Sequence, residues 1–307
     1  MSYYEKEYKR RLSLNRDGNA LVMLISINLV VFVLFKLIYV FYFFMFEKQA
    51  AELHYLNDFT KNIALPANFH ELFRKPWTLI THFFYHESVW HIISNMLWLW
   101  AFGYIMQDLT GSRKLIPVFI YGGIAGALAF LLAFNFIPAF RGQSAVALGA
   151  SAGVMAVAVA TTIIAPAYRI FPMLNGGIPL WVLTMIFLVI DLATIPGFNS
   201  GGHIAHIGGA LAGFLFIWLL RKGYDGSDWM NNLYEWVNNL FNPDKPKKGK
   251  KIREQLFYRS KTQPYKKTPN LTQQKIDEIL DKISQKGYSH LTEEEKELLK
   301  RASQEDL

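Results

Sequence analysis

The chain has 307 residues, of which 52% are hydrophobic and only 18% charged, a balance too apolar for an ordinary soluble domain of this length. Its net charge of +8 would suit nucleic acid, but the basic residues flank apolar runs, which favours anionic lipid and argues against nucleic acid as a partner. The chain contains no cysteine, which excludes disulfides, thiolate nucleophiles and cysteine metal sites.

The apolar residues are concentrated between about residues 20 and 220 and predict an all-α membrane protein. A spanning helix needs about 20 mostly apolar residues. Six such stretches follow one another, at 20–45, 87–107, 114–135, 147–165, 178–196 and 202–220. The first is too long for the core of a cleavable signal peptide and is interpreted as a retained anchor. The sequence therefore predicts a six-helix membrane domain at 20–220, after a cytoplasmic segment at 1–19.

Basic residues predict the orientation, because they are enriched in cytoplasmic loops. Arg113–Lys114 and Arg221–Lys222 follow the second and sixth stretches, and a basic cluster precedes the first. The long segment 46–85 also contains basic residues, but acidic residues are interleaved with them, and it is assigned to the outside. We therefore expect a multi-pass protein with both termini in the cytoplasm.

Three segments follow the sixth stretch. Residues 221–241 include an amphipathic helix with two tryptophans on its apolar face, which lies either in the membrane interface or on the protein's own cytoplasmic surface. Residues 242–270 are rich in lysine and proline and are interpreted as a basic linker. Residues 271–307 predict a small helical hairpin, in which Thr292 and Glu295 form a capping box.

Polar residues near the starts of the second, fourth and sixth stretches are the candidates for chemistry. All three stretches run inward from the outer face, so His91, Asn95, Ser151 and His206 are predicted to converge in the outer half of the membrane. Ser151 lies in a first helical turn, where free backbone N–H groups would stabilise an oxyanion. His206 is the candidate base, since a serine hydroxyl is a poor nucleophile alone. His91 and Asn95 share a helix face and would add oxyanion donors.

Small residues surround the candidate nucleophile. The residues expected to line the cavity beside it are His86, Gly149, Ala150 and Ala152. Gly209 and Gly213, four residues apart, would let the sixth helix approach the fourth closely. The alternative interpretation of Ser151 is a packing serine that bonds back to its own helix. His203, one turn before His206, is interpreted as a structural or rim residue.

A metal site is the chemical alternative. The histidines that would supply ligands are His82, His86, His91, His203 and His206. Trp90 stands where the zinc signature HExxH has its second histidine. Asp191 is interpreted as an interfacial residue, so no well-placed carboxylate completes a ligand set. Neither a catalytic metal nor another cofactor is predicted.

Three segments together resemble the rhomboid family of intramembrane serine proteases: PWTLITHFFYHESVWHIISNMLWLWAFG (76–103), GASAGV (149–154) and AHIGGALAG (205–213). The resemblance covers residues 20–220, and the short helical C-terminal extension is similar to one that some bacterial members have. This likeness implies a bacterial inner (cytoplasmic) membrane. The resemblance also implies a six-helix rhomboid-like bundle that cleaves transmembrane segments of other proteins near their outer ends.

For the site, the resemblance implies a dyad of Ser151 and His206 without a third, acidic member. It also implies an oxyanion hole made by His91, Asn95 and the Ser151 backbone, with His86 as the first histidine of the second span. A proteolytically inactive relative that binds transmembrane clients is the alternative function, although such relatives typically lack the serine or the histidine.

The sequence departs from the family pattern at three positions. Ala152 stands where the GxSG signature has its second glycine, and its methyl group is expected to narrow the oxyanion pocket. Met155 replaces an aromatic residue that supports the catalytic histidine in some members and is expected to pack under His206. Gln107 replaces a glutamate at the inner end of the second span, which is expected to weaken one structural contact.

Overall fold

The computed structural model describes residues 19–171, 176–197, 199–238, 240 and 273–303. The chain divides into two compact units, Met1–Asn242 and Pro243–Leu307, and each is described by itself. The basic linker expected at 242–270 lies outside the described residues, as does all of the N-terminal segment except Asn19.

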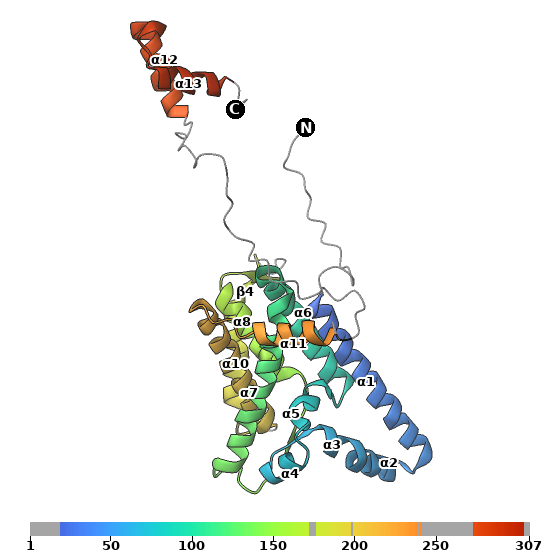
Figure 1. Ribbon diagram of the computed structural model, residues 1–307. Coiled ribbons are helices and arrows are strands. Elements are labelled where there is room, and N and C mark those ends of the chain that lie inside the picture. The colour runs from blue at the N-terminus through green and yellow to red at the C-terminus, as the bar shows by residue number, and fades with distance from the viewer. Residues whose placement is uncertain (1–18, 172–175, 198, 239, 241–272, 304–307) are drawn as a thin grey trace. The chain divides into compact units, whose positions relative to one another are not determined.

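Six apolar helices of the first unit fall in the six predicted stretches, in the predicted order (Figure 1). They are α1 (Ala20–Met45), α6 (Val89–Thr110), α7 (Leu115–Phe136), α8 (Ser151–Ile164), α9 (Leu180–Thr194) and α10 (Ser200–Arg221). By length and composition four described helices can cross a membrane: α1, α6, α10 and the continuous helical segment Ser112–Phe136 that contains α7. α8 and α9, with 14 and 15 residues, are shorter than the stretches that predicted them.

α8 is short because the chain before it is not helical. Strand β2 (Val146–Ala147) pairs antiparallel with β1 (Leu65–Pro66), and the helix begins only at Ser151. The prediction of one continuous stretch from 147 to 165 was therefore wrong at its start. The strand pairing brings the chain to the first turn of α8 in an extended form, and this determines where Ser151 lies.

The segment between α1 and α6 supports that strand. It was expected only as an outer segment, but much of it is helical: α2 (Lys48–Tyr55), the π-helix η1 (Leu56–Thr60), α3 (Lys61–Ile63), α4 (Phe69–Arg74), α5 (Thr78–Thr81) and the 3₁₀ helix η2 (His82–Phe84). The backbone N–H of Ala67 donates to the carbonyl of Ala145, and that of Gly149 to the carbonyl of His82. The outer segment thus holds both ends of the chain that leads to Ser151.

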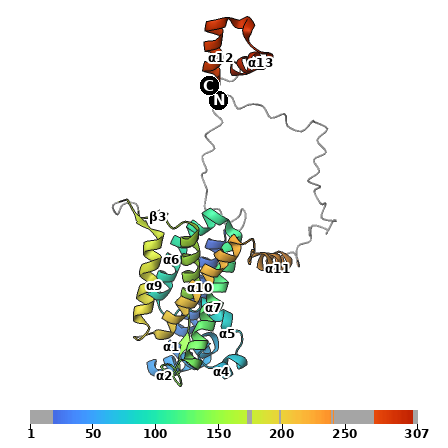
Figure 2. The same ribbon diagram turned by 90° about the vertical axis from the view of Figure 1, so that its left-hand side faces the viewer.

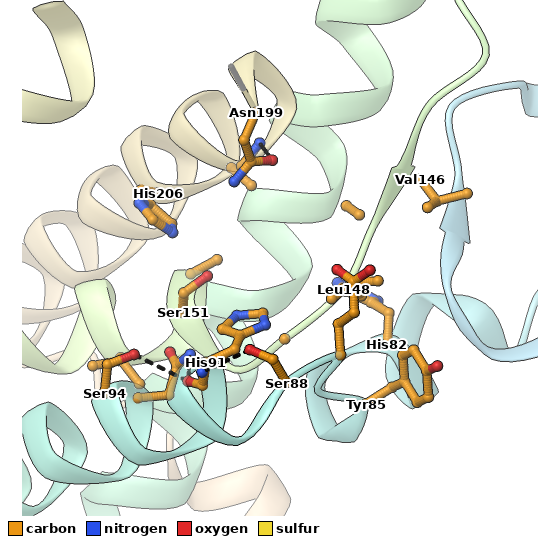
Figure 3. A pocket seen from close by; sticks show the side chains of 18 of the residues that line it. His82, Tyr85, Ser88, His91, Ser94, Val146, Leu148, Ser151, Asn199 and His206 are labelled. Atoms are coloured by element: carbon orange, nitrogen blue, oxygen red, sulfur yellow. Dashed lines mark hydrogen bonds between the residues drawn. The ribbon is translucent and has the colours of Figure 1, made fainter. Parts of the chain in front are cut away.

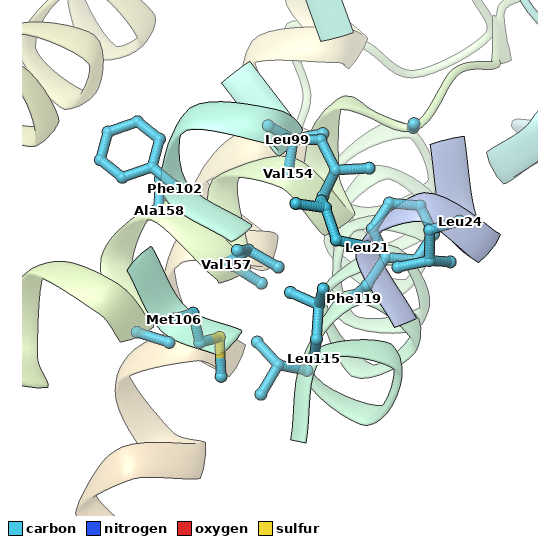
Figure 4. Packing of buried hydrophobic residues seen from close by; sticks show 14 of the residues in the cluster. Leu21, Leu24, Leu99, Phe102, Met106, Leu115, Phe119, Val154, Val157 and Ala158 are labelled. Carbon is cyan, nitrogen blue, oxygen red and sulfur yellow. The ribbon is translucent and has the colours of Figure 1, made fainter. Parts of the chain in front are cut away.

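α8 is the central helix of the bundle, since every residue from 152 to 161 is buried. Its apolar side chains pack with those of α1, α6 and α7 (Figure 4). Among them are Leu21, Leu99, Phe102, Phe119 and Val157. α9 lies at the edge of the bundle beside α10 (Figure 2), and most of its apolar side chains are exposed.

Glycines let α8 and α10 approach until their backbones touch. A methyl group added at Gly209 would lie 2.1 Å from the carbonyl oxygen of Ala152, and one at Gly213 would lie 2.2 Å from that of Ala156. No side chain fits at such distances, so the predicted role of this glycine pair is confirmed. Since Ser151 and His206 belong to these two helices, the contact sets the separation of the two side chains.

A short β-hairpin and an amphipathic helix complete the first unit. Strands β3 (Arg169–Ile170) and β4 (Ile178–Pro179) pair antiparallel before α9. Helix α11 (Asp228–Asn238) contacts the bundle through polar groups: the indole N–H of Trp229 donates to the Tyr121 hydroxyl, and Glu235 pairs with Arg113 at 3.0 Å. The large apolar side chains along α11 are exposed in the described structure, including Leu233, Trp236 and Val237.

The second unit contains the helical hairpin expected in the tail. It comprises α12 (Gln273–Lys286), the 3₁₀ helix η4 (Tyr288–His290) and α13 (Glu293–Ala302). The capping box is formed, since the Thr292 N–H donates to Glu295 Oε2 at 2.8 Å and the Glu295 N–H donates to Thr292 Oγ1 at 3.3 Å. Ile279 and Leu291 are its buried apolar residues among those described.

Candidate active site

A cavity of about 1150 Å³ opens among α6, α8, α9, α10 and the outer segment (Figure 3). The sequence-predicted residues in its lining are Ser151, His206, His91, Asn95, Gly149 and Ala152. Apart from Gly149, which precedes α8, these residues come from three helices that are distant in sequence. The structure thus brings together the side chains that the sequence predicts to converge at one depth of the membrane.

Ser151 is the first residue of α8, as expected. The chain turns into the helix at Gly149, whose φ of +102° favours a residue without a side chain. Ser151 Oγ makes no hydrogen bond to any described residue, so the back-bonded packing serine is not what the structure shows. No described group accepts a hydrogen bond from the backbone N–H groups of Ser151, Ala152 and Gly153. This helix start therefore offers a half-buried hydroxyl beside unsatisfied donors.

His91 and Asn95 lie beside that helix start. The His91 ring packs on Gly149 so closely that a methyl group there would lie 2.7 Å from its Nε2. The backbone of His91 is held by the Ser88 hydroxyl, which accepts its N–H at 3.1 Å. One N–H of the Asn95 amide donates to the His91 carbonyl at 2.8 Å, which leaves its second N–H for another acceptor.

His86 and Ala150 do not line the cavity, so the prediction for these two residues was wrong. His86 is 2% exposed and Ala150 is 1% exposed. The Ala150 N–H donates to His86 Nε2 at 3.3 Å, behind the cavity wall. His86 therefore fixes the backbone just before Ser151, because it accepts a donor that would otherwise be buried without a partner.

His206 has an acidic partner that sequence reasoning missed. Its Nδ1 donates to Asp191 Oδ1 at 2.9 Å, and His203 Nδ1 donates to the same oxygen at 2.8 Å. The side chain of Asp191 is only 7% exposed, so its interpretation as an interfacial residue was wrong. The rule that an intramembrane carboxylate is functional by default would have found it, since Asp191 is the only acid of its stretch.

When the His206 ring is neutral, its contact with Asp191 leaves the other ring nitrogen without a proton. A carboxylate accepts hydrogen bonds, so the neutral ring carries its proton on Nδ1 and a lone pair on Nε2. The His206 ring points toward Ser151 across the cavity (Figure 3). No hydrogen bond joins the two side chains in the described structure, an arrangement often found before a substrate is bound.

The three departures from the family pattern have defined surroundings. A methyl group at Gly126 of α7 would lie 2.5 Å from the Ala152 Cβ, so the Ala152 methyl fills the space that this glycine leaves. Met155 is buried in a cluster with Val159 and Ala210. Its contact with His206 stays a prediction.

Gln107 uses both ends of its amide at the start of α1. Oε1 accepts the Leu21 N–H at 3.1 Å, and Nε2 donates to Asn19 Oδ1 at 3.0 Å. Asn19 also accepts the Val22 N–H at 3.3 Å and thereby caps α1. A glutamate would lack the donor to Asn19, so Gln107 and Asn19 form a matched pair.

Two segments of the chain match known protein families. Residues 74–223 match the Rhomboid domain, and residues 262–305 match a family of unknown function (DUF6576). RHOMBOID-like protein 12, mitochondrial, of Arabidopsis thaliana is 28% identical over 48% of this chain and 47% of its own length. Rhomboid protein 1, mitochondrial, of Saccharomyces cerevisiae is 28% identical over 48% of this chain and 43% of its own length.

A third relative is the presenilin-associated rhomboid-like protein, mitochondrial, of Bos taurus, which is 26% identical over 61% of this chain and 46% of its own length. The chain thus matches less than half the length of each of these relatives. All three are mitochondrial proteins, so they give no support to the expected bacterial membrane. The Rhomboid match, the apolar helices and the relatives agree: residues 74–223 of this multi-pass membrane protein are a domain of the rhomboid family.

Proposed function

We propose that the protein is an intramembrane serine endopeptidase in which Ser151 is the nucleophile and His206 is its general base. One observation carries the proposal. A serine hydroxyl without an intramolecular partner in the described structure shares a cavity with an imidazole whose Nε2 is left as an acceptor by Asp191. A protein that only binds clients has no need for this proton arrangement.

The proposed reaction follows from the proton positions. His206 Nε2 takes the proton of Ser151 Oγ as the oxygen attacks the substrate carbonyl, and it later gives that proton to the leaving amine. The imidazolium formed in between is stabilised by Asp191, which acts as a positioning residue because it touches only the base. A water then attacks the acyl-enzyme with the same base.

The oxyanion is proposed to bind at the start of α8. The Ser151 N–H lacks a described acceptor, and His91 and Asn95 lie on the same cavity wall. Donors fixed in advance stabilise a developing charge more strongly than water does, because they do not have to reorient. The His91 ring and the second Asn95 N–H supply donors beyond the backbone.

The proposed substrates are transmembrane segments of other proteins, cleaved near the outer face. The cavity is bounded by the predicted outer segment, and Ser151 is one of the residues that line it. A peptide bond inside an intact helix is shielded by its own hydrogen bonds, so the substrate must unwind locally before attack. The basic segments near the two ends of the chain are proposed to bind anionic lipid, and the exposed apolar side chains of α11 are proposed to rest on the same surface.

The test is cleavage of a reporter transmembrane segment by the full chain in liposomes. Ser151→Ala and His206→Ala should each abolish the product. Ser112→Ala, which removes a hydroxyl at the opposite end of the bundle, should not change it. Product that persists in Ser151→Ala would contradict the serine mechanism. Reporter that co-purifies with the native chain but is never cut would favour the client-binding alternative.

A further inference from the structure

Asp191, His203 and His206 form a cluster with a second chemical use. The two histidines are three residues apart and share one face of α10, and the carboxylate comes from the neighbouring α9. Each residue offers one ligand atom, and the three atoms all lie within 4.8 Å of one another. The cluster therefore contains the well-placed carboxylate that the sequence analysis did not find.

Two imidazole nitrogens and one carboxylate oxygen are a ligand set that zinc uses in proteins, with a fourth position left for water. Tetrahedral bonds of about 2.0–2.1 Å place neighbouring ligand atoms about 3.3 Å apart. Asp191 Oδ1 now lies 2.8 and 2.9 Å from the two Nδ1 atoms. To admit an ion of this size, each of these two separations would have to widen by about half an ångström. The ligand atoms of the two histidines, which lie within 4.8 Å of each other, would also have to lie about 3.3 Å apart.

Two further features suit a cation. Asp191 Oδ2 is buried and has no hydrogen-bond partner among the described residues, so the carboxylate has an unused acceptor. With both imidazoles neutral the cluster has a charge of −1, which attracts a cation. Asp191 and His206 line the cavity, which gives an ion access from the water side.

We propose that this cluster binds a divalent transition-metal cation of the zinc class and that the bound ion inhibits the protease. The inhibition rests on the proposed function, whereas the binding does not. A metal on Nδ1 of His206 needs that lone pair, so the neutral ring must move its proton to Nε2. The ring charge does not change, but Nε2 becomes a donor and no longer accepts the Ser151 proton.

The cluster thus has two exclusive states. With protons on both Nδ1 atoms, Asp191 holds His206 in the tautomer that is needed for catalysis. With a metal, the same three residues hold the opposite tautomer. Since a general base contributes about 10²–10⁴ to the rate, filling the site should lower kcat about 100-fold or more.

Binding is tested first, without activity. The full chain with Ser151→Ala, purified without a histidine tag, is titrated with Co²⁺ and then with Zn²⁺, which replaces it. A visible absorption band of tetrahedral Co²⁺, lost on adding Zn²⁺, is expected. Adding His203→Asn should weaken Co²⁺ binding at least about tenfold. The matched control is His70→Asn, which removes an exposed histidine of α4 and should leave the titration unchanged.

Inhibition is tested second, in chains that keep Ser151. The quantity measured is the ratio of the cleavage rate with Zn²⁺ to the rate without it. The ratio should fall in the native chain and in His70→Asn, and should return toward one in His203→Asn. His86 and His91, with ring centroids 5.1 Å apart, are a second histidine pair near the same cavity. Inhibition that is equally strong in His203→Asn would place the ion elsewhere and overturn the proposal.

The protease proposal and the metal-site proposal can each be contradicted without the other. Co²⁺ binding by Ser151→Ala that depends on His203, in a protein whose native chain cleaves no reporter, would contradict the protease and leave the metal site standing. Cleavage by the native chain with no Co²⁺ band and no effect of Zn²⁺ would overturn the metal site alone. Binding with an unchanged rate would overturn the inhibition.

Discussion

Two of the helices that pack against α10, α8 and α9, are held in place in different ways. α8 touches α10 through backbone, because Gly209 and Gly213 have no side chain to separate the helices. α9 contacts its neighbours through side chains, such as the Thr162–Thr184 hydroxyl pair at 2.6 Å and the Asp191 contact with both histidines. Figure 2 shows α9 at the edge of the bundle, where only Leu180, Thr184 and Asp191 are buried.

This difference separates two requirements of the proposed serine protease site. The distance between the proposed nucleophile Ser151 and the proposed base His206 is set by backbone packing, which tolerates no added atom. The orientation of the base is set by a carboxylate on a helix whose contacts can be weakened one at a time. Substitutions in the contact between α8 and α10 should therefore either be tolerated or abolish both the fold and the activity. Substitutions in the side-chain contacts of α9 should each cause only a partial loss.

Gly209→Ala should have the largest effect. Its methyl group would lie 2.1 Å from the Ala152 carbonyl oxygen, so α10 must move away from α8. We expect a loss of about 3 kcal/mol or more of stability and no detectable cleavage. The readouts are the thermal unfolding midpoint in detergent and the liposome assay. Gly226→Ala is the matched control, because its methyl group meets its nearest neighbour at an ordinary 3.5 Å. A native midpoint for Gly209→Ala would contradict the backbone contact.

Asp191→Asn should spare the fold and reduce the rate. The amide keeps the shape but no longer fixes the proton of His206 on Nδ1, so we expect kcat to fall about 10²- to 10⁴-fold with KM nearly unchanged. A role in structure alone would lower the unfolding midpoint instead. Asp58→Asn, which removes a carboxylate bonded to the Tyr42 hydroxyl in the outer region, is the control. A rise in KM with unchanged kcat would contradict the positioning role.

The α8 side could be predicted from the sequence more fully than the α9 side. Long apolar runs determine the order of the helices, and Ser151 among small residues indicates a helix start in close contact. The start of α8 was placed four residues too early, because β2 is held by a strand from about 80 residues before it. Non-local pairing of this kind leaves no periodic signal in the short segment 146–150.

The acidic partner was missed because α9 is apolar on all sides, so its composition does not define which face meets α10. The signal that was present is the spacing of polar residues. Thr184 and Asp191 are seven residues apart, which is about two helical turns, and both are buried on one face. The family resemblance implies a dyad without an acidic member, so it does not predict this carboxylate.

Thr184→Val should have a small, graded effect on the α9 side. It removes the hydroxyl that bonds Thr162 of α8 and keeps the volume. Hydrogen bonds between membrane helices contribute about 0.6 kcal/mol on average, and we expect a loss of that size with a rate close to the native one. Thr162→Val and the double variant complete a double-mutant cycle. Strictly additive losses would show that the pair is not coupled and that other contacts hold α9.

The smallest effect is expected at Asp225, which lies outside the spanning helices between α10 and α11. Burial pushes the pKa of Asp225 up, but hydrogen bonds from Lys114 Nζ at 2.8 Å and from Ser227 outweigh it and hold the pKa below its ordinary value. A carboxyl with a lowered pKa stabilises the fold above its unfolded pKa of about 3.9 and loses that effect as pH falls through the folded value.

Asp225→Asn should therefore lower the unfolding midpoint at neutral pH by the equivalent of less than about 1 kcal/mol, since water reaches both partners. The difference from the native chain should vanish as the pH falls below the native pKa of Asp225, where the carboxyl is protonated in both states. Lys114→Met should reproduce most of this loss and add little to it in the double variant. A native–variant difference that stays constant from neutral to acid pH would show that the asparagine acts on packing instead. In that case the contacts of Asp225 would act through packing, as the backbone contact between α8 and α10 does. They would differ from the side-chain contacts of α9, which can be weakened one at a time.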